Sequence, residues 1–259
     1  MWWIVALGVF VIVLVGVGVV IGPFLTLKRL PQRAEINGVV VVKDGMVSAS
    51  LVPFNEGEVA LIDAGNDAEA KAILAELSRR GLTADDVKVI LLTHGDADHV
   101  GGVAKFPKAQ VMALETEVDA GASQAAGGVP MVRPRMSKSP GIRLARTLRD
   151  GEVVQLGSLQ ARVFAVPGHT PGSAAYAIGQ TLFLGDSANQ DKRGRLKASP
   201  WVFTKNREQN RKALVDLAHR LSGDSSIKTL VFGHSAPLER GTAPLADFAM
   251  EASTAPGRS

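Results

Sequence analysis

Residues 89–102 read Val-Ile-Leu-Leu-Thr-His-Gly-Asp-Ala-Asp-His-Val-Gly-Gly, and this stretch decides the fold. An apolar run of strand length ends at Thr93. Four side chains that can bind a metal follow within six residues: His94, Asp96, Asp98 and His99. Unpaired imidazoles and carboxylates beside a buried strand lose their hydration at a cost in free energy unless they coordinate something. The stretch therefore predicts a metal-binding loop at the end of a buried strand.

Three later apolar runs of strand length also end in a turn with a candidate ligand. These ligands are His169, Asp186 and His234. In each turn a glycine directly precedes the ligand, and the missing side chain lets the backbone bend close to an ion. Ligands delivered from several strand ends would form a rigid, preorganised site. The fifth histidine, His219, lies in the predicted helix 206–221, where we expect a surface or packing role.

The loop resembles the HxHxDH signature of the metallo-β-lactamase superfamily, with Asp96 in place of the second histidine. The other ligand positions of that family find matches in His169, Asp186 and His234, and the resemblance covers residues 37–245. It implies an α/β fold, the four-layer αβ/βα sandwich, with two metal ions. One ion would be bound by His94, Asp96 and His169, and the other by Asp98, His99 and His234, with Asp186 between them.

The resemblance also implies a metal-dependent hydrolase. A hydroxide shared by two ions is a nucleophile at neutral pH, because metal binding lowers the pKa of water to about 7. Asp98 and Asp186 are the candidate catalytic residues, and Zn²⁺ is the expected metal. The substrate would be a small molecule with an ester, thioester, amide or phosphoester bond.

Asp96 is the departure from the family signature. Asp96, Asp98 and Asp186 carry three negative charges and a hydroxide adds one, so two divalent ions are just neutralised. A carboxylate in place of an imidazole favours harder metals such as iron or manganese. Flavodiiron proteins of the superfamily carry a Glu here, one methylene longer than Asp. Two alternatives follow: an iron-dependent oxidoreductase, di-iron or similar to persulfide dioxygenases, and a metal-binding module with weakened activity.

Three further features bear on function. Asp63 resembles the strand-end Asp of Asp-x-Gly that family members place beneath the metal loop; it would orient a ligand, or serve only as a turn residue. The charged segment 191–197 follows the bridging Asp, and it either attracts an anionic substrate or is simply solvated. Tyr176 is the single tyrosine and precedes Asp186, which argues against acyl-homoserine lactonase activity, where a Tyr follows that position.

Composition sets wider limits. A chain of 259 residues, 46% hydrophobic, can bury a full single-domain core. The absence of cysteine excludes thiolate ligands and disulfides, so a metal site must use His and carboxylate. The net charge of +4 comes without a basic stripe with interleaved aromatics, and we therefore expect no nucleic-acid partner.

The N-terminal run 2–27 contains no charged residue. Its length matches a membrane-spanning helix rather than a secretory signal. Trp2 and Trp3 at one end and Lys28, Arg29 and Arg33 at the other suit the two interfaces, and the basic cluster favours a cytoplasmic domain. The predicted organisation is a membrane anchor over 1–27, a linker over 28–36, the metal-binding domain over 37–250 and a flexible tail over 251–259.

Within the domain, alternating or apolar runs predict strands and 3.6-residue periodicity predicts helices. Strands are expected at 39–42, 47–52, 59–62, 87–92, 153–156, 159–166, 174–178, 181–184 and 229–232. Helices are expected at 67–80, 206–221 and 245–250. Residues 115–149 are predicted as a helix and a long loop, which either lies over the site or is a solvated insertion.

Overall fold

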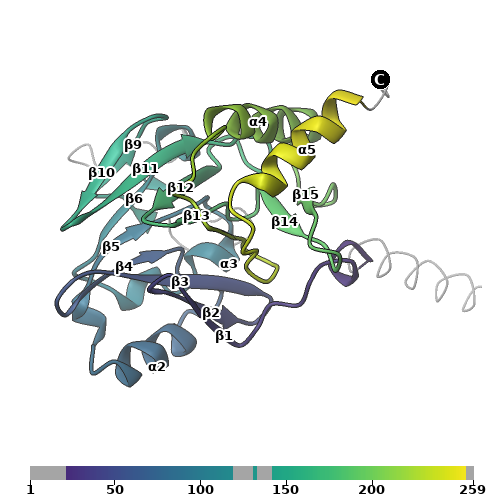
Figure 1. The fold of residues 1–259 in the computed structure, drawn as a ribbon. Helices are drawn as coiled ribbons and strands as arrows, with labels where there is room; N and C mark the ends of the chain where they lie inside the picture. The colour runs from purple at the N-terminus through teal and green to yellow at the C-terminus, as the bar shows by residue number, and fades with distance from the viewer. Residues whose placement is uncertain (1–21, 119–130, 133–141, 255–259) are drawn as a thin grey trace, which may run out of the picture.

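Two mixed β-sheets form the centre of the molecule (Figure 1). The computed structural model describes residues 22–118, 131–132 and 142–254. The first sheet has seven strands in the order β1-β2-β3-β4-β5-β6-β9. Their bounds are Arg33–Ile36, Val39–Asp44, Val47–Asn55, Glu58–Ile62, Val87–Leu91, Gln110–Leu114 and Arg146–Leu148. Strands β1 to β4 pair antiparallel, whereas β4, β5, β6 and β9 run parallel.

The second sheet has five strands in the order β10-β11-β12-β13-β16, and only the β13–β16 pair is parallel. Their bounds are Val153–Leu156, Leu159–Ala165, Ala174–Ile178, Thr181–Phe183 and Thr229–Val231. Two short hairpins accompany the sheets. They are β14 with β15, Ala188–Gln190 and Leu196–Ala198, and β7 with β8, Met131–Val132 and Ile142–Arg143.

Helices cover both outer faces of the sandwich (Figure 1). Helix α2, Lys71–Arg79, packs Ile73 and Leu77 on the first sheet, one helical turn apart. Helices α4 and α5, Arg207–Arg220 and Ala243–Thr254, cover the second sheet. A separate apolar cluster fills the space between the sheets. Short helices complete the fold: η1 Ala84–Asp86, α3 Ala97–Val100, η2 Val103–Lys105 and η3 Glu115–Glu117.

The layers are therefore helix, sheet, sheet and helix, as the family resemblance implied. The strands predicted from alternation and apolar runs are confirmed to within a few residues. Helix α2 starts later than predicted, because Ala70 at its N-cap adopts a left-handed conformation with φ 48°. The segment 115–149 contributes η3, β7, β8 and β9, and its residues 119–130 and 133–141 lie outside the described residues.

Two elements extend beyond the limits predicted for the metal-binding domain. Arg33–Ile36 was assigned to the linker, but it forms the edge strand β1 on β2. Arg33 is held there by Glu76 of α2, at 2.8 Å between Nε and Oε2, a long-range ion pair that local sequence does not reveal. The last helix continues to Thr254, past the predicted end of the domain at residue 250.

The N-terminal run is only partly described. Residues 1–21, where most of the predicted membrane anchor falls, lie outside the described residues. Residues 22–25 are helical, and Leu27 is 6% exposed and forms an antiparallel bridge with Asp191. The end of the run thus packs on the domain. No helix among residues 22–118 and 142–254 is long and apolar enough to cross a membrane.

Candidate metal centre

The seven side chains predicted as ligands meet in one place. They come from the four segments that follow β5, β11, β13 and β16, and Asp98 and His99 lie in the short helix α3. Their potential donor atoms form three overlapping groups in which all atoms lie within 4.8 Å of one another. The groups are His94 with Asp96 and His169, His94 with His99 and Asp186, and Asp98 with His99 and His234. The topology of two sheets therefore brings together side chains that lie far apart in the sequence.

The first group shows whether Asp96, with a side chain one methylene shorter than Glu, reaches the position of a metal ligand. Its Oδ2 lies 3.2 Å from Nε2 of His169 and 3.6 Å from Nε2 of His94. The shorter side chain of Asp, compared with Glu, therefore still reaches the same point as the two imidazoles. A carboxylate at this distance can serve as a direct ligand.

Asp186 lies between the two predicted metal positions. Its Oδ1 is 3.3 Å from Nε2 of His99, and its Oδ2 is 3.0 Å from Nε2 of His234 and 3.7 Å from Nε2 of His169. Asp98 belongs to the group with His99 and His234, and its Oδ2 lies 3.4 Å from Nε2 of His234. The Asp98 side chain is 38% exposed and the Asp186 side chain 10%, so Asp98 is the more open carboxylate of the two.

All four histidines turn Nε2 toward the centre and use Nδ1 on the protein side. Nδ1 of His99 lies 2.7 Å from Oδ2 of Asp63, Nδ1 of His169 lies 3.0 Å from Oγ of Ser199, and Nδ1 of His234 lies 2.7 Å from the carbonyl oxygen of Met46. A carboxylate or carbonyl only accepts a hydrogen bond. The Nδ1–H tautomer of His99 and His234 is therefore fixed, and the lone pair of Nε2 points into the centre.

His94 is oriented through Thr93. The hydroxyl of Thr93 donates to Oδ2 of Asp63 at 2.7 Å, because the carboxylate has no proton to give. Its oxygen then accepts from Nδ1–H of His94 at 3.0 Å. One carboxylate, Asp63, thus orients His99 directly and His94 through one hydroxyl. Asp63 therefore does more than close a turn.

The centre fits divalent cations. Nε2 of His94 and of His99 are buried without a hydrogen-bond partner, although an uncompensated polar atom in the interior is costly. The two rings lie only 4.0 Å apart between centroids. Four imidazoles and three carboxylates are a hard-to-borderline donor set that suits zinc, iron or manganese.

The charges in the centre are strongly coupled. Burial opposes ionisation of Asp186, but the charges of His234 and His99 outweigh it and hold its pKa well below the usual value. Burial lowers the pKa of His234, but the charge of Asp186 and the hydrogen bonds that His234 donates to Asp186 and Asp98 raise it to about 10. The pKa of His169 is lowered, chiefly by burial. Clustered anionic charge thus attracts positive charge to this point.

The glycines before the ligands are sterically required. A Cβ on Gly233 would lie 2.1 Å from Oδ1 of Asp186, and one on Gly168 would lie 2.2 Å from the backbone nitrogen of Asn210. Gly168 also has φ 133°, which other residues rarely adopt. The backbone approaches the centre this closely only because no side chain intervenes.

Glu117 is a supporting residue that the sequence did not reveal. Its carboxylate accepts from Gly95 N at 2.8 Å in the first metal loop, and from Thr170 Oγ1 at 2.7 Å and Gly172 N at 2.9 Å after His169. It therefore ties two ligand loops together. Glu117 is separated from both loops along the chain, and no local motif marks it.

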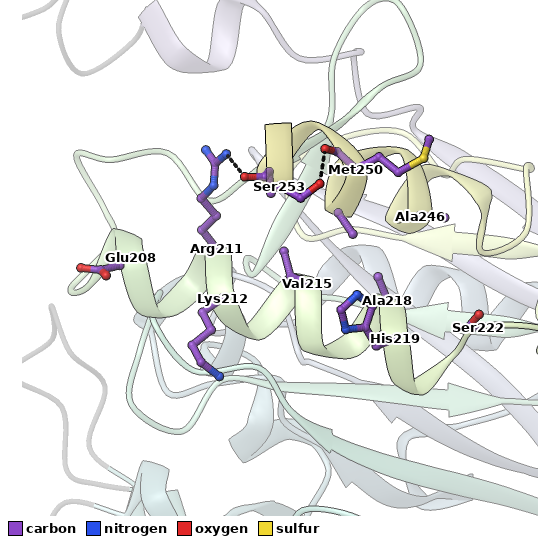
Figure 2. A pocket seen from close by; sticks show the side chains of 12 residues that line it. Glu208, Arg211, Lys212, Val215, Ala218, His219, Ser222, Ala246, Met250 and Ser253 are labelled. Atoms are coloured by element: carbon purple, nitrogen blue, oxygen red, sulfur yellow. Dashed lines mark hydrogen bonds between the residues drawn. The ribbon is translucent and has the colours of Figure 1, made fainter. Parts of the chain in front are cut away.

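Other predicted features lie away from the ligands. His219 lies on α4 beside a groove of about 540 Å³ between α4 and α5, as Figure 2 shows. Tyr176 is buried and donates to the carbonyl oxygen of Leu92 at 2.7 Å, so it supports the strand before the metal loop. In the segment 191–197, Asp191 accepts from Arg195 and closes the turn between β14 and β15.

A two-sheet α/β sandwich with a buried His and Asp centre at its loop edge defines a metalloprotein of the hydrolase-like class. The profile of the Metallo-beta-lactamase superfamily matches residues 42–234, more than half of the chain. The protein belongs to this superfamily.

Comparisons with individual proteins agree with this family assignment. The chain is 37% identical over 158 residues to a hydroxyacylglutathione hydrolase of Rhodopseudomonas palustris (strain BisB18), covering 60% of this chain and 52% of the relative. It is 35% identical over 191 residues to a beta-lactamase hydrolase-like protein of Xylella fastidiosa, covering 66% and 41%. The chain thus spans about half the length of the curated relatives it matches, or less. A solved metallo-beta-lactamase family protein of Thermus thermophilus shares the fold, with 24% identity, TM-score 0.59 and coverage of 84% and 80%.

Proposed function

We propose that this protein is a metal-dependent hydrolase that cleaves an acyl bond, with an acyl thioester or ester as its substrate class. The observation that carries the proposal is the convergence of His94, Asp96, Asp98, His99, His169, Asp186 and His234 on one centre. The curated relatives named for the hydrolysis of hydroxyacylglutathione support an acyl substrate. Amides and phosphoesters remain within the chemistry of the fold and are the comparison substrates.

The donor set would hold two ions. His94, Asp96 and His169 would hold one, Asp98, His99 and His234 the other, and Asp186 has an oxygen facing each group. When bound, such ions supply a water nucleophile at neutral pH and an electrophile for the scissile carbonyl oxygen. The ligand shell of the protein fixes where that chemistry takes place.

The residues of the chain contribute position and proton transfer. Asp63, Ser199 and the Met46 carbonyl hold three imidazoles by Nδ1, which keeps the Nε2 atoms aimed at the centre. Asp98 is the accessible carboxylate. Burial opposes its ionisation, but a hydrogen bond with His234 and the charge of His99 outweigh burial and keep its pKa below the usual value. It is therefore ionised at neutral pH and can accept a proton from water or pass one to the leaving group.

Asp96 favours a second candidate, an iron-dependent activity of the same centre. Its carboxylate lies within 3.6 Å of both histidines of the first group, which makes that group more anionic than three imidazoles would be. Hard or borderline ions gain most from such a ligand. Metal analysis and oxygen consumption distinguish this candidate from a zinc hydrolase.

The experiment combines metal loading with a substrate screen. Purified full-length protein is depleted with a chelator, reloaded with Zn²⁺, Mn²⁺ or Fe²⁺, and assayed on acyl thioesters, lactones, β-lactams and phosphodiesters. We expect at least one bound ion per chain and metal-dependent thioester or ester cleavage, which His169→Ala and His234→Ala abolish. Less than one tightly bound ion, or oxygen consumption by the iron form without hydrolysis, contradicts the proposal.

We also propose that the uncharged run 2–21 anchors the protein in a membrane, with the domain on the cytoplasmic side. The length of the run and the basic residues Lys28 and Arg29 after it support this proposal. Carbonate-resistant membrane association that is lost when residues 2–21 are deleted would agree with it. Protease protection in sealed spheroplasts but digestion in inverted vesicles tests the side of the membrane.

A further inference from the structure

Residues 24–28, at the end of the N-terminal run, are hydrogen-bonded to the segments that follow Asp186 and His234. Lys28 N donates to the carbonyl oxygen of Gln190 at 3.1 Å, and Lys192 N donates to that of Thr26 at 3.1 Å. On its other side, Ala236 N donates to the carbonyl oxygen of Lys28 at 3.1 Å. In Figure 1 this purple segment lies beside the β14–β15 hairpin. It is therefore pinned between the chain that follows Asp186 and the loop that carries His234.

This attachment brings an aromatic side chain to the ligands. The ring of Phe24 meets that of His234 edge-on, with centroids 5.4 Å apart and an interplanar angle of 75°. Phe24 also packs on Phe203, again at 5.4 Å between centroids. Phe203 belongs to the turn after Ser199, the residue that orients His169. We call Phe24 and Phe203 the aromatic wall; it contacts His234 and continues into the turn after Ser199.

Exposed apolar side chains come from the same segments. Leu25 is 65% exposed, Met46 62% and Trp201 54%. Leu25 neighbours Phe24, Trp201 neighbours the turn of Phe203, and the Met46 carbonyl accepts from His234. An apolar surface beside a polar metal centre is what a substrate with a polar scissile bond and an apolar chain requires.

We propose that the aromatic wall binds the apolar chain of the acyl group, so that Phe24 determines specificity for medium-chain or longer acyl esters and thioesters. This inference rests on the proposed hydrolase function and narrows its substrate class. An acyl chain that packs on the wall is removed from water, and each buried methylene then strengthens binding by about fourfold. A short hydroxylated acyl group would gain nothing from these rings.

The test is the chain-length profile of one substrate series. The probes are S-acyl thioesters of N-acetylcysteamine, from acetyl to octanoyl, with kcat/KM measured on metal-loaded full-length protein. We expect kcat/KM to rise with chain length. Phe24→Ala should lower the octanoyl-to-acetyl ratio by about tenfold, since the truncated side chain no longer covers the methylenes. Phe24→Leu should retain most of the ratio, because the contact surface stays apolar.

Controls separate specificity from structural damage. Phe54→Ala is the matched control, because Phe54 packs between the sheets at the end of β3 remote from Met46. It should leave the ratio unchanged. Metal content and melting temperature are measured for each variant. If Phe24→Ala does not fold, Phe203→Ala provides a second test and should lower the same ratio, because Phe203 is the other ring of the wall.

The outcomes of this experiment are distinguishable. Metal-dependent cleavage of all thioesters at equal rates, or an unchanged ratio in folded Phe24→Ala, overturns the aromatic wall and leaves the hydrolase function standing. Absence of metal-dependent cleavage of every acyl thioester and ester overturns both. A falling ratio with wild-type metal content supports both.

Discussion

Oδ2 of Asp63 lies 2.7 Å from Nδ1 of His99, and the same carboxylate accepts hydrogen bonds from the backbone nitrogen and the hydroxyl of Thr93. Asp63 is 3% exposed and adopts φ 58°, a left-handed conformation that is costly for a residue with a Cβ. The surrounding hydrogen bonds offset this strain. One buried carboxylate therefore fixes the position of Thr93 and the orientation of His99 in the first metal loop.

We predict that Asp63→Asn weakens metal binding by roughly 10- to 100-fold, the usual effect of removing a partner behind a ligand histidine. The amide places donors where three donors already point, so His99 loses its fixed tautomer. Competition with a chromophoric chelator measures the affinity. Asp85→Asn, at an exposed ion pair with Lys108, is the control and should bind metal like the wild type. An unchanged affinity in Asp63→Asn would show that Asp63 only closes the turn.

Asp96 yields a prediction about stoichiometry. Asp96→Ala removes the carboxylate of the first group while leaving the second group intact, so bound metal should fall from about two ions per chain to about one. Asp96→His restores a third imidazole and should restore the second ion. Elemental analysis after gel filtration measures both. Two ions retained by Asp96→Ala would exclude Asp96 as a ligand.

Much of the centre could be predicted from sequence because its ligands follow apolar strands. Period-two alternation and glycine-preceded turns mark strand ends locally, and strand ends are where a sandwich gathers its loops. His169, Asp186 and His234 were therefore identifiable as candidates without knowing how the sheets pair. The order of the strands, with β9 beside β6, depends on long-range pairing and could not be predicted from the sequence.

The supporting residues escaped prediction for a physical reason. Glu117 and Ser199 act through hydrogen bonds to loops distant in sequence, and an isolated Glu or Ser has no periodicity to reveal those contacts. Phe24 looked like part of an uncharged run that suits a membrane. Its packing on His234 depends on backbone pairing between residues 26–28 and the loop after Asp186. This pairing depends on the fold of the domain, and the composition of the N-terminal run does not reveal it.

Glu117 connects the loops of His94 and His169. Its loss should therefore weaken metal binding mainly at the group of His94, Asp96 and His169. Glu117→Ala removes acceptors from two backbone nitrogens and one hydroxyl, so we expect the free energy of unfolding to fall by about 2 kcal/mol. The first ion should be released at lower chelator concentration than the second. Urea unfolding and stepwise metal release measure these effects. Equal weakening of both ions would contradict a local role.

Glu76 joins α2 to the edge strand β1 and predicts a pH dependence of stability. Its side chain is 3% exposed and accepts from Nε of Arg33 at 2.8 Å and Nε of Arg80 at 3.0 Å; the bond with Arg33 is the main cause of a pKa below 4.5. Because the folded pKa is depressed, the stabilisation is present above pH 4.5 and is lost as the pH falls through the lower folded value. Glu76→Gln should therefore lower the free energy of unfolding by about 2 kcal/mol at pH 7, and the difference from wild type should narrow below pH 4.5. Asp216→Asn, at an exposed ion pair with Lys212, should change stability by less than about 1 kcal/mol and shows what a surface charge alone contributes. A wild-type advantage over Glu76→Gln that stays constant from pH 7 to pH 3 in urea unfolding would assign the effect to packing and not to the ion pairs.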